Sequence, residues 1–90
     1  MGPPYLEKVG QRGPITVWVV DGSYVRKNLD EEFTNFGQHY RFNFIPENEF
    51  WIDVGATPDE RLFFIEHLLV EHRLMREGVS YEKALELADR

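Results

Sequence analysis

The fold follows from residues 57–77, whose sequence is TPDERLFFIEHLLVEHRLMRE. Thr57 can act as an N-cap, Pro58 suits the first helical position, and Glu60 three residues after the cap completes a capping box. The carboxylates of Asp59 and Glu60 also favour the positive end of the helix dipole. This start predicts a helix from Pro58 to about Glu77.

A second helix is expected immediately afterwards. Gly78 supplies the stop of the first helix, and Ser80 can cap a second one from Tyr81 to about Asp89. Because the connection is very short, the second helix should fold back beside the first as a helical hairpin.

Short strand patterns precede the helices. Residues 1–13, with several prolines and glycines, are expected to form a flexible arm, and residues 14–90 one domain. The patterns predict strands at 15–20, 23–29, 38–45 and 49–53, a hairpin turn at Asp21-Gly22, and a helical turn at 30–35 ended by Gly37. Strands followed by helices indicate an α+β fold, a small antiparallel sheet of three or four short strands before a C-terminal helical hairpin.

The composition restricts the function. Ninety residues with a net charge of −6 make a small acidic domain, which is a poor binder of nucleic acid or of an anionic membrane. The chain has no cysteine, so it has no disulfide and no cysteine-based zinc site. No apolar run reaches the roughly 20 residues that span a bilayer, and the start of the chain lacks a signal-peptide pattern. We expect a cytoplasmic protein.

His67 and Glu71 are the candidate site residues. They lie four positions apart and therefore share one face of the predicted helix. That helix is apolar over most of its circumference, and only Glu66 and Arg73 form a clear polar stripe, so the helix should be largely buried. Two buried polar side chains need partners. The partner could be a metal ion, an arginine, a hydroxyl or a backbone carbonyl, and the spacing would suit shared coordination of zinc.

These residues also resemble a known metal-site segment. The segment is His67 to Glu71 followed by Arg73-Leu74-Met75, Gly78 and residues 80–84. It is similar to the site of small microbial and phage-type proteins that resemble minimal zinc metallopeptidases. Upstream matches lie at residues 32–34, 37–39 and 44–53. The resemblance implies a zinc site at His67 and Glu71, with His39 in a nearby loop, and a phage or mobile-element setting.

The chain departs from that pattern at two positions. The general base that follows the first histidine in such peptidases is replaced by Leu68, and the histidine ligand of the second helix by Leu85. Only His67 and Glu71 remain, unless His39, His72, Glu82 or Glu86 completes the site. His72 points about 100° away from Glu71 around the helix, so the two should not bind one ion.

Three functions follow from these observations. The first is a non-catalytic relative of the zinc peptidases that acts through protein–protein contact, with no cofactor. The second is a zinc-binding hydrolase that uses His67, Glu71 and an unidentified third ligand. The third is a small acidic interaction module unrelated to peptidases. Aromatic residues make up 14% of the chain. If some of them form an exposed patch, that patch would mark a surface for an unidentified protein partner or for a homo-oligomer.

Overall fold

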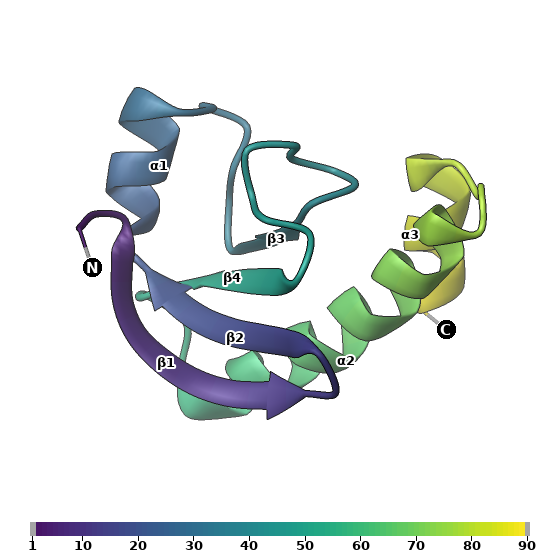
Figure 1. The fold of residues 1–90 in the computed structure, drawn as a ribbon, viewed down its shortest axis with the longest axis horizontal. Coiled ribbons are helices and arrows are strands. Elements are labelled where there is room, and N and C mark those ends of the chain that lie inside the picture. Colours follow the sequence, from purple (N-terminus) through teal and green to yellow (C-terminus); the bar gives the residue numbers. More distant parts are fainter. Residues whose placement is uncertain (1, 90) are drawn as a thin grey trace.

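The computed structural model describes residues 2–89, in which four strands form one sheet that packs with helices (Figure 1). The elements in chain order are β1 (Tyr5–Arg12), β2 (Ile15–Val20), α1 (Gly22–Asn28), β3 (Phe36–Gln38), β4 (Glu49–Asp53), α2 (Pro58–Arg76) and α3 (Tyr81–Ala88). The strand order is β1-β2-β4-β3. The α+β architecture and the C-terminal helical pair agree with the expectation from the sequence.

The sheet is mixed, which corrects the expected antiparallel sheet. β1 and β2 form an antiparallel hairpin, and β3 pairs antiparallel with β4, but β2 and β4 run parallel with Trp18 opposite Trp51. Parallel neighbours require a crossover connection. The chain supplies one between residues 21 and 48, and α1 is part of it.

Two N-terminal expectations were wrong. Residues 5–12, assigned to a flexible arm, form β1 and pair with β2 along its length. Asp21-Gly22 is not a hairpin turn, because Asp21 is the N-cap of α1 and its carboxylate accepts a hydrogen bond from the Tyr24 amide at 3.2 Å. Residues 23–29 are therefore helical over most of their length and do not form a strand.

The segment before β4 also differs from expectation. β3 covers three residues, whereas the sequence predicted a strand at 38–45 and a helical turn at 30–35. Beyond Gln38 the chain turns, with amides of Arg41 and Phe42 bonded to the Gln38 carbonyl and the Ile45 amide bonded to the Phe42 carbonyl. The alternating aromatics of this stretch belong to a folded loop that packs on the sheet.

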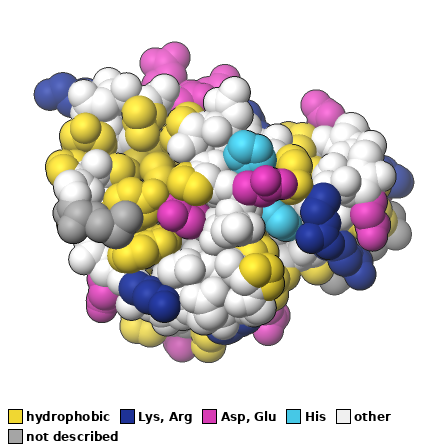
Figure 2. All heavy atoms as spheres, viewed as in Figure 1, with side chains coloured by type: hydrophobic (Ala, Val, Ile, Leu, Met, Phe, Trp, Pro, Cys, Tyr) yellow, Lys and Arg dark blue, Asp and Glu magenta, His cyan; other side chains and the backbone are white. Residues whose placement is uncertain are grey.

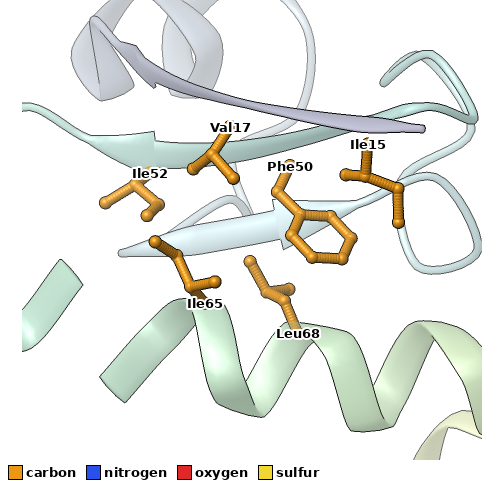
Figure 3. Close-up of a cluster of buried hydrophobic side chains, with 6 residues drawn as sticks. All are labelled: Ile15, Val17, Phe50, Ile52, Ile65 and Leu68. Atoms are coloured by element: carbon orange, nitrogen blue, oxygen red, sulfur yellow. The ribbon is translucent and has the colours of Figure 1, made fainter. Parts of the chain in front are cut away.

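Each face of the sheet carries its own core. On one face, α2 places Ile65 and Leu68 against Val17, Phe50 and Ile52, as Figure 3 shows. The other face is covered by α1 and the loop before β4. Its buried members are Val20, Val25, Phe33, Phe42, Ile45 and Trp51. Figure 2 shows hydrophobic side chains gathered on the surface between α1 and β1.

The helices agree with the sequence-based expectation. The Thr57–Glu60 capping box is present, with the Thr57 amide bonded to the Glu60 carboxylate at 2.8 Å. Gly78, at φ 99°, ends the turn after α2, and Ser80 caps α3. α3 folds back along the C-terminal part of α2 (Figure 1). Within residues 2–89, no helix has both the length and the apolar character needed to cross a membrane.

Candidate functional site

His67 and Glu71 lie on the same buried face of α2, as the spacing predicted. Their relative exposures are 5% and 3%. The His67 Nε2 atom is 3.2 Å from Glu71 Oε2. The pair lies where α2 meets β3 and α3, so these two polar groups are removed from water inside the domain.

Asp89, at the C-cap of α3, completes the surroundings of His67. Its Oδ1 atom is 3.2 Å from His67 Nδ1, and its side chain is 60% exposed. The imidazole therefore has a carboxylate beside each ring nitrogen. Neither carboxylate is aligned for a hydrogen bond, so both nitrogens lack a directed partner among the described residues. His67 is therefore in close contact with both carboxylates without hydrogen-bond geometry.

Gln38 is the second partner of Glu71. The Gln38 Nε2 atom donates to Glu71 Oε1 at 2.8 Å, and Gln38 Oε1 accepts from the Tyr40 amide at 2.6 Å. Gln38 is fully buried on β3. This hydrogen bond ties the centre of α2 to an edge strand, and both carboxylate oxygens of Glu71 have neighbours inside the protein.

The sequence analysis missed both Gln38 and Asp89. A signal for Asp89 was available, because His67 and Asp89 are equally distant from Gly78 and an antiparallel helical hairpin brings such positions together. No comparable signal marked Gln38. The resemblance to the zinc peptidases pointed to its neighbour His39 instead.

His67, Glu71, Asp89 and Gln38 together form what we call the His67 cluster. His39 lies away from this cluster. Its Nδ1 atom is 2.8 Å from the Ile45 carbonyl oxygen, and its ring packs edge-on against Tyr40. His72 also faces elsewhere, with Nε2 3.3 Å from the Glu47 carbonyl oxygen. Neither histidine contacts His67, so neither supplies the third ligand that the zinc hypothesis requires.

The side chains present do not fit the zinc site that the resemblance implies. Among residues 2–89, no three histidine, aspartate or glutamate side chains are placed so that they could hold one metal ion. Leu68, at the position of the general base, is fully buried between α2 and the sheet (Figure 3). It packs in the same cluster as Phe50 and Ile65, whereas His67 contacts Asp89 at the C-cap of α3.

Burial also changes the titration of His72. This residue is 6% exposed, and its ring packs against Phe50 and Tyr40. Burial lowers the pKa of His72 below its ordinary value, and the positive charge of Arg76 adds to that effect. The neutral imidazole is therefore the form that the folded chain favours.

An exposed apolar face lies beside the His67 cluster. Leu62 and Phe63 on α2 are 58% and 62% exposed. A hollow of about 340 Å³ lies between α2 and α3, lined by Phe63, Glu66, His67, Val70, Ala88 and Asp89. A second hollow, of about 400 Å³, lies on the other side of α2. Its lining is Pro14, Ile15, Leu69, Val70, His72, Arg73 and Arg76. Val70 borders both hollows.

No protein-family model, no curated protein and no solved structure matches this chain.

Proposed function

We propose that this chain is a non-catalytic protein-interaction domain that resembles minimal zinc metallopeptidases in architecture and contacts its partner through the exposed face of α2. The observation that carries the proposal is the exposure of Leu62 and Phe63, at 58% and 62%, on a helix whose opposite side is core. Large apolar side chains grouped at a surface, beside hollows and charged groups, are typical of protein contact sites.

In this proposal the His67 cluster has a structural role. His67, Glu71 and Asp89 join α2 to α3, and Gln38 joins α2 to β3. These contacts hold the buried side of α2 in one orientation, so its opposite side is presented rigidly to a partner. A rigid surface loses less conformational entropy on binding than a flexible one.

The proposal assigns no peptidase chemistry to the cluster. A zinc peptidase needs a general base next to the metal-bound water. Leu68 occupies that position, cannot accept a proton, and is part of the hydrophobic core. The polar side chains of the His67 cluster contact one another, which favours a structural role over a catalytic one.

The test is selection from a random peptide library displayed on phage, with the purified chain as bait. Phe63→Ser and Leu62→Ser should each abolish the peptide families that the unaltered chain selects. Leu6→Ser is the matched control, because Leu6 is 57% exposed and Leu62 58% exposed, but Leu6 lies on β1. Peptide families that survive both α2 substitutions, or that are lost with Leu6→Ser instead, would overturn the proposal.

A further inference from the structure

We propose that the hollow between α2 and α3 binds a lysine or arginine side chain of the protein partner. The proposal rests on the proposed function, because it names the chemistry that the partner brings to the exposed face of α2. The hollow has a volume of about 340 Å³, and Phe63, whose exposure carries the proposed function, is part of its wall. A basic side chain joins an apolar stem to a charged head, and the hollow offers a matching surface to each part.

The walls of the hollow come from one stripe of α2 and the end of α3. The α2 residues of the lining lie three, four and seven positions after the first of them, so they project to the same side of the helix. They are Phe63, Glu66, His67 and Val70. The last turn of α3 adds Ala88, and its C-cap adds Asp89. An aromatic ring and two small aliphatic side chains thus lie beside two carboxylates.

The carboxylates at the hollow lack a basic partner. Glu66 is exposed, and among residues 2–89 no ion pair includes it. The described lining contains no lysine and no arginine. Asp89 and the buried Glu71 both lie beside His67, which can carry at most one positive charge. Whether or not His67 carries it, the three carboxylates outnumber the positive charges, so the hollow favours a cation.

The imidazole of His67 is a second and independent sign of a missing donor. It is 5% exposed, and neither ring nitrogen has a hydrogen-bond partner among residues 2–89, although a carboxylate oxygen lies 3.2 Å from each. A neutral imidazole has one N–H and one lone pair, and a carboxylate only accepts. One ring nitrogen therefore faces a carboxylate as acceptor against acceptor. A cation bound to Asp89 from the hollow neutralises the carboxylate beside Nδ1, and the ring can then direct its N–H to Glu71.

The occupant is organic rather than a metal ion. Among residues 2–89 no three donor side chains are placed to hold one ion, and much of the wall is apolar. An ammonium or guanidinium group needs no such shell, since it binds carboxylates by hydrogen bonds and can lie over an aromatic ring within about 6 Å of its centre. Phe63 offers that ring beside Glu66, and Val70 and Ala88 can cover the stem. The net charge of −6 also attracts a basic segment at longer range.

The phage selection also tests the chemistry of the hollow, once the selected peptides are sequenced. The families that depend on Phe63 should share a lysine or arginine at one fixed position. Glu66→Lys combined with Asp89→Lys should lose these families and select peptides with aspartate or glutamate at that position instead. Such a reversal cannot arise from a misfolded variant. The control is Glu77→Lys combined with Glu82→Lys, which changes the net charge equally at exposed carboxylates outside the hollow and should keep the basic preference.

A double-mutant cycle measures the contact itself. One selected peptide is synthesised with its basic residue and with norleucine in its place, which keeps an apolar stem and removes the charge. Norleucine should weaken binding to the unaltered chain at least about tenfold in fluorescence anisotropy. The same replacement should change binding to the variant with Glu66→Gln and Asp89→Asn by less than about threefold, because the carboxylates that distinguish the two peptides are gone.

Peptide families that depend on Phe63 but share no basic residue would overturn the proposal while the proposed function stands. A basic preference that survives the two lysines in the hollow, or that the control pair also abolishes, would overturn it as well, because the preference would then follow the net charge or another surface. Norleucine that weakens binding equally to the unaltered chain and to the amide variant would have the same consequence. Selection that shows no dependence on Phe63 would remove the proposed function too.

Discussion

Gln38 and Glu71 form a side-chain hydrogen bond inside the domain, with Gln38 Nε2 2.8 Å from Glu71 Oε1. The two residues come from β3 and α2, and they are 33 positions apart along the chain. Gln38 is fully buried and Glu71 is 3% exposed. A polar bond between two such groups gains from the low local dielectric and becomes costly when one partner is lost. It therefore fixes the orientation of α2 relative to the sheet edge.

Gln38→Met should destabilise the fold by about 1–3 kcal/mol, because it leaves a buried carboxyl oxygen and the Tyr40 amide without a partner. Urea unfolding followed by circular dichroism measures the change. Gln11→Met is the matched control, since the side chain of Gln11 makes its hydrogen bonds at the exposed end of β1. It should cost less than about 0.5 kcal/mol. An equal decrease in the free energy of unfolding in the two variants would contradict a special role for the Gln38–Glu71 hydrogen bond.

Leu68→Glu should destabilise the domain severely, by at least about 4 kcal/mol, because it places a carboxylate in the cluster formed with Phe50 and Ile65. Leu68→Met keeps the volume and apolar character and should cost less than about 1.5 kcal/mol. Thermal unfolding of both variants tests this. A stable Leu68→Glu variant would mean that position 68 can reach the polar cluster, and the catalytic interpretation would regain support.

Zinc should leave the stability of the unaltered chain unchanged. Anything that binds the folded state alone raises the unfolding midpoint by mass action. His67 and Glu71 are neighbours of each other, and no third donor joins them in a metal-binding arrangement within residues 2–89. Calorimetry with one equivalent of zinc, followed by EDTA, measures the shift. A midpoint that rises with zinc and falls with EDTA would favour the hydrolase hypothesis.

Gly22→Ala should destabilise the fold by about 1–3 kcal/mol. A Cβ at position 22 would lie 2.5 Å from Asp53 Oδ1, which accepts a hydrogen bond from the Gly22 amide at 3.2 Å. Gly55→Ala is the matched control, because its nearest contact would be Asp53 Oδ2 at 3.6 Å, an ordinary van der Waals distance. Chemical unfolding measures the free energy of unfolding of the two variants. A neutral Gly22→Ala would show that the carboxylate of Asp53 moves aside at little cost.

This close approach explains why part of the fold escaped the sequence analysis. Asp21-Gly22 after an apolar strand is a strong hairpin signal. Here the aspartate caps α1, and the glycine makes room for Asp53 from β4. That carboxylate lies 31 residues away along the chain. Local patterns carry no information about such a neighbour, and with α1 unrecognised the parallel pairing of β2 with β4 was also missed.

The helices and the buried pair were predictable because their signals are local. Capping residues and the Gly78 stop act within one turn, and the four-residue spacing places His67 and Glu71 on one face wherever the helix lies. The partners of that pair were not predictable in the same way. Gln38 reaches Glu71 through tertiary packing. Asp89 follows from the hairpin geometry, once both helices are known to pack along each other.

Stability should fall at acidic pH partly through His72. Burial holds the pKa of His72 in the folded chain below the ordinary value of 6.5, so below that value the unfolded chain binds protons first. The contribution of His72 is therefore fully present above pH 6.5 and is lost as the pH falls through the lowered, folded-state pKa.

His72→Phe keeps a ring between Tyr40 and Phe50 and removes this titration. The variant should lose less stability than the unaltered chain between about pH 8 and about pH 5, even if it is less stable at the alkaline end without the contact to the Glu47 carbonyl. Urea unfolding across that range gives the slope of unfolding free energy against pH for the unaltered chain and for the variant. The NMR titration of the His72 ring gives its pKa directly. Parallel slopes, or a ring that titrates at or above 6.5, would mean that His72 tolerates its charge inside the fold. The acid sensitivity of the domain would then have to arise from groups other than His72.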